Sequence, residues 1–286
     1  MCRFAAYIGR PLLINDVMSK PKVSLIRQSS CATETDITLN GDGFGIAWYN
    51  SEISDIPAVF KSPLPAWNDM NLRNMSHQLL SNCFFAHVRA STEGVVNQVN
   101  CHPFRYQQYL MMHNGDIGGF KKIKLALLSK LAPQFFNNIE GQTDSEILFC
   151  LWLTYLENLE TPTQTSMTEA WEKTLVTLKE LQDEAQIKYP TYINSMITEG
   201  NQMIGIRYAR IDKASLTLHY AEGSAFVHSQ GVSKMLPKIE HDLHNSVLIS
   251  SEKLTGETDE WKEVPHQHFI YVDHYKRVHL TAIKNT

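Results

Sequence analysis

Apolar residues recur in short runs along the first part of the chain, and residues that favour turns separate these runs. The runs are CRFAAYIG (residues 2–9), GFGIAWYN (43–50), FFAHVRAS (84–91) and QYLMMHNG (108–115), each bounded by Gly, Asn, Pro or Ser. Short runs with this punctuation are typical of β-strands. The pattern therefore predicts a first half rich in strands.

Apolar residues three and four positions apart predict helices at residues 67–80, 120–131 and 144–159, the last with a broad apolar face. A longer amphipathic helix is expected from about Thr168 to Lys188, where Ser166 and Glu169 have the spacing of a capping box. Pro190 is expected to end it.

The remaining chain returns to alternating strand patterns: NQMIGIRYARI (201–211), LTLHYAEG (216–223), SVLISSEKL (246–254) and HFIYVDHYKRVHLTAI (268–283). Strands followed by helices and then strands favour an α+β fold over strict βαβ alternation. Residues 160–167 are a candidate domain boundary and equally a surface loop, so we treat residues 1–286 as one domain.

Charge and hydropathy exclude several classes of partner. The sequence has 26 basic and 30 acidic residues, a net charge of −4, without the basic footprint of a nucleic-acid binder. Charged residues, Gly and Pro interrupt the apolar N-terminus, so no secretory signal is expected. The longest apolar run, Ile147 to Leu156, is about half the ~20 residues that span a membrane. We expect no membrane association and a cytoplasmic location.

Cysteine and histidine spacing gives no sign of a metal site. The five cysteines are odd in number and lack a C-x-x-C pair, so they are predicted to be free thiols, at least four of them buried: Cys2, Cys31, Cys83, Cys101 and Cys150. Among twelve histidines the close pairs are His241/His244 and His266/His268, without an H-E-x-x-H motif. We predict no metal site.

Cys2 has the most unusual position. Methionine is generally removed before a small residue, which would leave Cys2 with both a thiol and a free α-amine. An α-amine has a pKa of about 7.7–8.0 and can take the thiol proton near neutral pH. Cys2 is therefore a candidate N-terminal nucleophile, although an ordinary second residue is the commoner case for position alone.

Three further segments carry candidate chemistry, each with a bland alternative. Arg89, followed by Thr92, ends a predicted strand and could grip a carboxylate or remain solvated. Asn114–Gly115 is either a tight turn or an oxyanion hole made by a side-chain amide and a backbone N–H. Asp144 lies where a helix begins, with Thr143 and Glu146 at capping-box spacing, and could also hold a substrate ammonium.

The run NGDGFG at residues 40–45 matches neither common phosphate-loop pattern. Its glycines are better explained by close backbone approach inside a sheet.

Taken together, seven segments resemble the class II glutamine amidotransferases, in particular their stand-alone YafJ/EgtC/Dug3-like group. They are MCRFAAYIG, NGDGFGIAWY, FFAHVRAST, NQVNCHPF, YLMMHNGDI, GQTDSEIL and SSEKLTGETDEWKEVP, in the same order from residue 1 to about 265. The joint occurrence is far more specific than any one motif.

This resemblance implies a four-layer αββα sandwich of the N-terminal-nucleophile hydrolase type. Cys2 would be nucleophile and, through its amine, base, with Asn114 and Gly115 as the oxyanion hole. Arg89 would bind the substrate carboxylate and Asp144 its ammonium, and Thr92, His102 and His113 would flank the pocket. The implied reaction is hydrolysis of a γ-glutamyl amide through a thioester, without a cofactor.

The resemblance leaves the acceptor open. A separate subunit could receive the ammonia, or the enzyme could hydrolyse γ-glutamyl peptides or conjugates rather than free glutamine. A non-catalytic protein that binds glutamine-like ligands is the third alternative. The sequence leaves the oligomeric state open.

Overall fold

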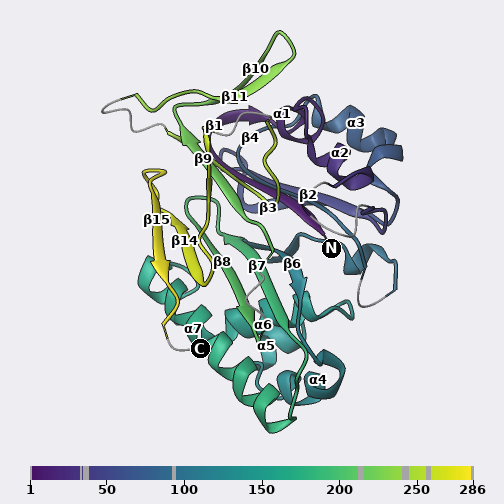
Figure 1. The fold of residues 1–286 in the computed structure, drawn as a ribbon, viewed down its shortest axis with the longest axis vertical. Coiled ribbons are helices and arrows are strands. Elements are labelled where there is room, and N and C mark those ends of the chain that lie inside the picture. Colours follow the sequence, from purple (N-terminus) through teal and green to yellow (C-terminus); the bar gives the residue numbers. More distant parts are fainter. Residues whose placement is uncertain are drawn as a thin grey trace.

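The computed structural model describes residues 2–32, 34, 39–91, 95–211, 216–239, 245–255 and 259–284. Two antiparallel sheets are stacked face to face (Figure 1). The first has seven strands in the order β13 (Trp261–Glu263), β9 (His219–Gly223), β12 (Ser246–Ser250), β1 (Arg3–Leu13), β4 (Leu80–Val88), β2 (Phe44–Asn50) and β3 (Ser54–Ser62).

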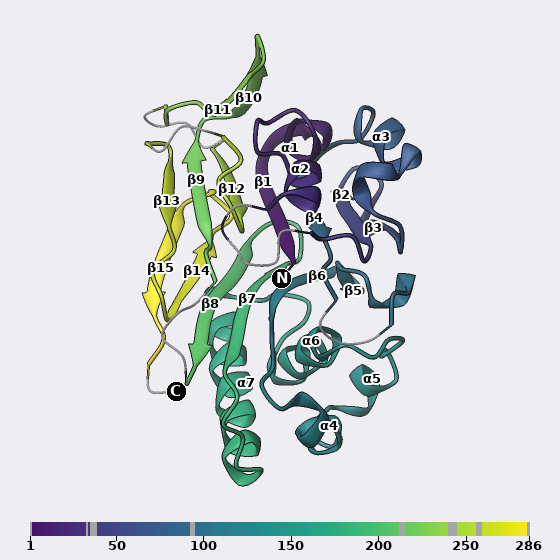
Figure 2. The ribbon, with the colours of Figure 1, turned by 45° about the vertical axis from the view of Figure 1, so that its right-hand side comes forward.

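The second sheet has six strands, in the order β15 (Val278–Ala282), β14 (His268–Val272), β8 (Met203–Arg210), β7 (Thr191–Thr198), β6 (Tyr109–Asp116) and β5 (Phe104–Tyr106). A separate hairpin, β10 (Phe226–Ser229) and β11 (Val232–Met235), extends beyond the sheets (Figures 1 and 2). The sheets place the start of β1 beside β6, which brings residues from both sheets to one end of the sandwich (Figure 2).

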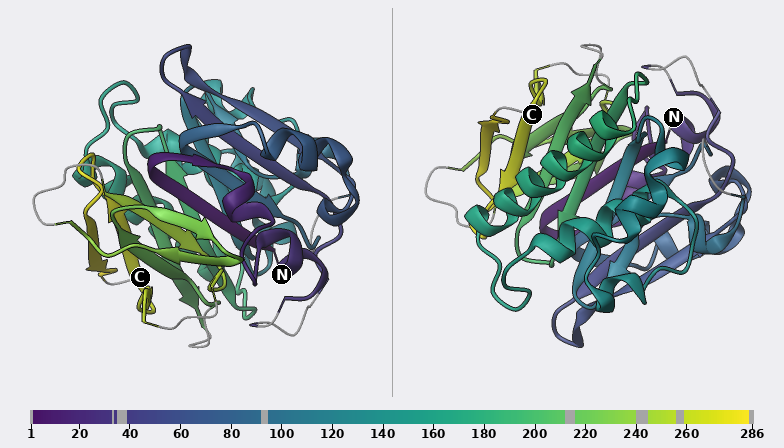
Figure 3. Two further views of the ribbon diagram at one scale, coloured as in Figure 1. Left: turned by 90° about the horizontal axis from the view of Figure 1, so that it is seen from above. Right: turned by 90° about the horizontal axis from the view of Figure 1, so that it is seen from below.

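Helices cover the outer face of each sheet. The second sheet carries α4 (Phe120–Leu128), α5 (Pro133–Phe136), α6 (Asp144–Tyr155) and α7 (Gln164–Glu184), seen in front of its strands in the right-hand view of Figure 3. The first sheet carries α1 (Asn15–Met18), α2 (Leu25–Ser30) and α3 (Met70–Ser76). Two single turns, η1 (Ala66–Asn68) and η2 (Gln98–Asn100), lie in loops. The four layers are those of the predicted αββα sandwich.

Strand alternation distributes side chains among three apolar clusters. In β1, Phe4 packs between the sheets with Phe85 and Met112, whereas Ala5 and Tyr7 face α1–α3. Because both faces of β1 are covered, its residues from Arg3 to Ile8 are all buried. A continuous apolar run is what such a strand requires.

Helix α6 is buried along most of its length, from Asp144 to Leu153, between the second sheet and α7. Thr143 caps it by accepting a hydrogen bond from the Glu146 backbone N–H at 3.2 Å. The predicted capping box is only half formed, because the Glu146 carboxylate accepts instead from the backbone N–H groups of Glu140 (2.9 Å) and Gly141 (2.8 Å). These two bonds fix the loop that leads into the helix.

Several predicted boundaries are wrong. The helix expected at 67–80 is the turn η1 followed by α3, and Leu80 already begins β4. Helix α7 begins at Gln164 and is capped by a capping box between Thr163 and Ser166, so the predicted pairing of Ser166 with Glu169 is wrong. Residues 160–167 are the connection from α6 to α7 together with the first turn of α7. Strands β3, β5, β7, β10, β11 and β13 were not predicted.

Three of the five cysteines, Cys83, Cys101 and Cys150, are buried as expected. Cys31 is exposed and Cys2 is half-buried, so the expectation that at least four are buried is wrong. Within the described part of the chain, no helix is long and apolar enough to cross a membrane.

The packing between the sheets should dominate stability. Phe85 is fully buried there, so Phe85→Ala is expected to lower the free energy of unfolding by about 3–5 kcal/mol through lost burial and a residual cavity. Ile53 is 81% exposed, and Ile53→Ala should change it by less than about 0.5 kcal/mol. Urea unfolding of both variants checks this, and equal losses would contradict the assigned core.

Candidate active site

Cys2 lies directly before β1, at the end of the sandwich where the two sheets and α6 meet. Its Sγ donates to the carbonyl oxygen of Ala90 at 3.4 Å. A small cavity of about 20 Å³ opens beside it, enough for about one water molecule. The cavity is lined by Cys2, Arg89, Ala90, Ser91, His102, His113, Gly115, Thr143, Asp144 and Ser145.

Burial raises the pKa of the Cys2 thiol, and the hydrogen bond to Ala90 and the charges of Arg89 and Arg3 oppose this only in part. A raised pKa keeps the thiol protonated at neutral pH. A nucleophile in this position therefore needs a base to remove its proton.

Arg89 follows β4, and its side chain is buried with 2% exposed. Its Nη2 donates to Ser91 Oγ at 3.0 Å, and its Nη1 lies 3.4 Å from the carbonyl oxygen of Val95. The backbone N–H of Arg89 donates to the Gly43 carbonyl at 2.8 Å. These contacts hold the guanidinium at the wall of the cavity.

The glycine-rich run before β2 supports this arrangement. The Asp42 carboxylate accepts from the Ser91 backbone N–H at 2.8 Å. Gly43 has φ +109°, and a Cβ there would lie 2.5 Å from Cys101 Sγ. A Cβ at Gly45 would lie 2.2 Å from the His102 carbonyl oxygen. The predicted close backbone approach is confirmed, and its effect is to seat the loops that carry Arg89 and His102.

Asn114 and Gly115 lie inside β6 and not in a turn. Alternation along β6 directs Asn114 to the same side as Met112, toward the first sheet and the start of β1. The Asn114 side chain is fully buried, and within the described residues neither its Nδ2 nor its Oδ1 has a hydrogen-bond partner. An unsatisfied buried amide is costly, which points to a partner other than the protein itself.

Gly115 lines the cavity, and a side chain there would collide with the neighbouring strand. A Cβ would lie 1.9 Å from the carbonyl oxygen of Tyr192 on β7. The position therefore needs glycine because of close backbone packing.

Asp144 begins α6 and has 4% of its surface exposed. Its Oδ2 accepts from the Ile117 backbone N–H at 2.9 Å, and its Oδ1 accepts from the Ser145 backbone N–H at 2.7 Å. Backbone donors on both oxygens hold the carboxylate in one orientation.

Three buried histidines lie together at the cavity, where His102 and His113 line the wall and His87 stacks on His102. His113 Nδ1 lies 2.9 Å from Ser145 Oγ and its Nε2 lies 3.2 Å from the Tyr192 carbonyl oxygen. His102 stacks on His87 with ring centroids 4.1 Å apart, and within the described residues neither His102 ring nitrogen has a partner. Burial lowers the pKa of all three, to about 3 for His87, so they are neutral at physiological pH.

The structure thus brings Cys2, Arg89, Gly115, Asp144, His102 and His113 to one cavity, with Asn114 beside it on β6. Thr92 and Met1 lie outside the described residues. The sequence did not single out Ser91 and Ser145, although each adjoins or nearly adjoins a predicted site residue. The described residues contain no group of three His, Cys, Asp or Glu side chains placed to hold a metal ion.

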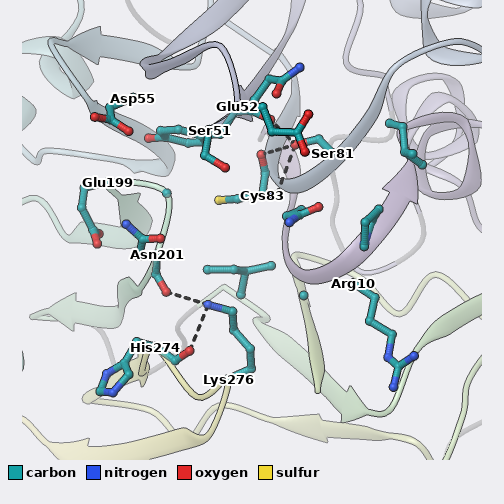
Figure 4. A pocket seen from close by; sticks show the side chains of 18 of the residues that line it. Arg10, Ser51, Glu52, Asp55, Ser81, Cys83, Glu199, Asn201, His274 and Lys276 are labelled. Carbon is teal, nitrogen blue, oxygen red and sulfur yellow. Dashed lines mark hydrogen bonds between the residues drawn. The ribbon is translucent and has the colours of Figure 1, made fainter. Parts of the chain in front are cut away.

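A larger cavity of about 1090 Å³ lies at the opposite end of the sandwich, where Ile8–Pro11 of β1 meet the start of β4 and the end of β2. Figure 4 shows Glu199, after β7, and Lys276, between β14 and β15, on its wall. Lys276 Nζ donates to the carbonyl oxygens of Asn201 (2.8 Å) and His274 (3.3 Å). This cavity contains none of the residues around Cys2.

Comparison with known proteins decides the family. The sequence profile described as "Glutamine amidotransferases class-II" matches residues 16–284. The chain belongs to the class II glutamine amidotransferases. The probable glutamine amidotransferase DUG3 of Saccharomyces cerevisiae is 34% identical over 93% of this chain and 80% of its own length. The γ-glutamyl-hercynylcysteine sulfoxide hydrolase of Mycolicibacterium smegmatis is 31% identical over 40% of this chain and 51% of its own.

Solved structures of this amidotransferase family share the fold. A glutamine aminotransferase class-II domain protein from Silicibacter pomeroyi superposes with a TM-score of 0.68 at 23% identity, over 99% of this chain and 100% of the other. Glutamine phosphoribosylpyrophosphate amidotransferase from B. subtilis gives 0.61 at 14% identity, over 100% of this chain and 50% of the other. The predicted family and the αββα fold are confirmed.

In this amidotransferase, Glu199 in the far cavity should make the stability of the fold depend on pH. Burial raises the pKa of Glu199 from 4.5 to about 7, only partly offset by backbone N–H groups and Lys276. The unfolded chain releases this proton near pH 4.5 and the folded protein near pH 7, so stability falls as pH rises across that interval. Glu199→Gln should therefore gain stability relative to wild type between pH 5 and pH 8, by up to about 3 kcal/mol.

Urea unfolding at the two pH values measures this gain. Glu52→Gln, at an exposed carboxylate of the same cavity, is the matched control. A Glu199→Gln effect that does not change with pH would contradict the raised pKa.

Proposed function

We propose that the chain hydrolyses the γ-glutamyl amide of glutamine or of a related γ-glutamyl compound, with Cys2 as the nucleophile. Membership of the class II glutamine amidotransferases supports the reaction class. The observation that carries the residue assignment is the single cavity shared by the Cys2 thiol, the Gly115 backbone, the Arg89 guanidinium and the Asp144 carboxylate.

Removal of Met1 would expose the α-amine of Cys2, which then takes the thiol proton. The sulfur attacks the γ-carbonyl carbon, and the carbonyl oxygen becomes negative in the tetrahedral intermediate. The protonated amine returns the proton to the leaving nitrogen, so ammonia or an amine departs and a thioester remains. Water, deprotonated by the same amine, attacks the thioester and releases glutamate and the free thiol.

Two donors from β6 would stabilise the oxyanion. The buried Asn114 Nδ2 has no protein partner within the described residues, and Gly115 contributes its backbone N–H. Donors that are already oriented before reaction are worth most where water is excluded. This role accounts for an amide that would otherwise be buried at a cost.

The charged head of the substrate would be bound by Arg89 and Asp144. A guanidinium grips the α-carboxylate in a fixed geometry, and the immobilised carboxylate of Asp144 receives the α-ammonium. Neutral His102 and His113 would form the adjoining wall, and Thr92 would contact the head group. The cavity of about 20 Å³ is smaller than glutamine, so binding requires the walls to separate.

The identity of the leaving amine defines the second candidate. The Mycolicibacterium smegmatis relative is named as the hydrolase of a γ-glutamyl conjugate, which favours a conjugate or peptide substrate as the alternative to free glutamine. Binding without turnover and a separate ammonia-accepting subunit stay alternatives, and a cytoplasmic location stays a prediction. A screen of glutamine against γ-glutamyl dipeptides ranks the first two candidates by kcat/KM.

Replacing the nucleophile should abolish turnover. We expect Cys2→Ala to release no glutamate above background, because no thioester can form. Cys31→Ala, at an exposed thiol, should keep the wild-type rate. Glutamate release measured with enzyme that carries no N-terminal tag checks both, and wild-type activity in Cys2→Ala would contradict the proposal.

Removing an oxyanion donor should lower turnover with little effect on binding. Asn114→Ala is expected to reduce kcat by about 10²–10³-fold while KM stays within a few-fold, because the donor acts mainly in the transition state. Asn82→Ala, at an exposed asparagine on the far end of β4, is the control. Steady-state kinetics measure both, and a loss confined to KM would assign Asn114 to substrate binding instead.

A further inference from the structure

The residues that hold the backbone of Cys2 lie outside the cavity. Arg3 donates from Nη1 to the Cys2 carbonyl oxygen at 2.8 Å. The same guanidinium forms an ion pair with Glu252, in which Arg3 Nε lies 2.7 Å from Glu252 Oε1. Both side chains are buried, with 2% and 1% exposed. A charged pair, separated by 249 positions in the sequence, therefore holds the residue that carries the nucleophile.

Strand alternation shows that this pair does not face the substrate. Phe4 points between the sheets, so Arg3 leaves β1 on the opposite face, the one that Ala5 shares. Neither Arg3 nor Glu252 lines the cavity beside Cys2. The pair does not touch the substrate, so it acts on the reaction through the position of Cys2 and through the charge of Arg3, which lowers the pKa of the Cys2 thiol.

The chain after β12 fixes this pair from a second direction. Phe4 N–H donates to Ser251 Oγ at 3.1 Å, and Ser251 N–H donates to the Phe4 carbonyl at 3.1 Å. Glu252 Oε1 also accepts from the backbone N–H of Glu34 at 3.0 Å, and Glu34 Oε2 lies 3.0 Å from His219 Nε2 on β9. Ser251 thus holds the backbone at Phe4 while Glu252 holds the side chain of Arg3.

Burying two charges costs free energy, which indicates that the Arg3–Glu252 pair does more than stabilise the fold. Desolvation of two charges largely cancels their attraction, and apolar residues of similar volume commonly stabilise a fold as well as a buried ion pair does. Chain ends, in contrast, are poorly ordered unless they are tied down. The paired strand begins at Arg3, so the sheet alone does not hold Cys2.

We propose that Arg3 and Glu252 are positioning residues for the Cys2 nucleophile. The thiol and the α-amine are both carried by the Cα of Cys2, and the orientation of its carbonyl group restricts where both point. The Arg3 guanidinium fixes that carbonyl, and Glu252 fixes the guanidinium. This inference rests on the proposed function, because it assigns a task only if Cys2 is the nucleophile.

The test compares Arg3→Met, Glu252→Gln and the double variant with wild type. Misplacement of a reacting group by about 1 Å can cost about 10²-fold in rate. We expect each single variant to lose about 10²-fold in kcat for glutamine, with KM within about threefold. The double variant should lose little more than either single one, because the residues act as one unit. Glu252→Asp, which keeps the charge, should recover part of the rate.

The rate of covalent labelling of Cys2 by 6-diazo-5-oxo-norleucine gives a second readout that does not depend on turnover. It should fall in parallel with kcat. Arg277→Met, which breaks the Arg277–Asp273 ion pair (2.8 Å) remote from the cavity, is the matched control and should label at the wild-type rate. Intact mass must show that Met1 is absent in every variant compared.

The outcomes separate the two proposals. If wild type is labelled and the variants label and turn over at the wild-type rate, the positioning role is overturned and the proposed function stands. Variants that lose thermal stability but keep wild-type kcat per folded molecule make the pair merely structural, which also overturns it. If Glu252→Gln fails to fold, the kcat and labelling rate of Arg3→Met decide. A processed wild type that forms no adduct at Cys2 and releases no glutamate removes the proposed function, and this inference with it.

Discussion

The burial of β1 at the centre of the first sheet is the constraint on which the rest of the site depends. Strands pair with it on both sides, and apolar layers cover both its faces, so the first residues of the chain lie deep inside the fold. This placement determines where Cys2 lies. Cys2 adjoins the first paired residue of β1, at the end of the sandwich that β6 and α6 also reach. The strand that follows Cys2 is held by β4 and β12 on its two sides, and the contacts of Arg3 extend this order to the Cys2 backbone.

The polar groups around Cys2 are those that a stable core would avoid. Asn114 and His102 have buried side-chain atoms without a hydrogen-bond partner in the described parts of the chain, and burial keeps three histidines neutral. Each such group lowers stability unless a ligand or water satisfies it. The large apolar clusters on either side of the sheets offset this cost. The fold can therefore hold buried polar groups at one end of the sandwich.

Local patterns predicted the parts of the fold whose character is local. The runs that became β1, β2, β4 and β6 are apolar and bounded by turn residues, and α6 is apolar almost throughout. Strand β3 was missed because Pro57 and exposed polar residues obscure its pattern at the edge of the sheet. Strand β7 was missed because polar Asn194 and Ser195 interrupt its apolar run, although both are buried.

The residues of the site also fall into those that local motifs predict and those that only tertiary contacts bring together. Motifs in order along the chain predicted Cys2, Arg89, Asn114, Gly115 and Asp144, and the fold brings them together, although their roles stay proposals. The pairing of Arg3 with Glu252 has no local signal, since it joins two ends of the sequence through the register of β1 with β12. Neither the turn that was one alternative for Asn114–Gly115 nor the buried state expected of Cys31 was found, because tertiary contacts decide both.

The most direct test of the central claim is the intact mass of the untagged protein before and after incubation with 6-diazo-5-oxo-norleucine, followed by peptide mapping. The account predicts a protein that lacks Met1 and gains one adduct, located on Cys2. An adduct on Cys31, Cys83, Cys101 or Cys150 in place of Cys2, or a processed protein that is never labelled yet releases glutamate, would contradict it.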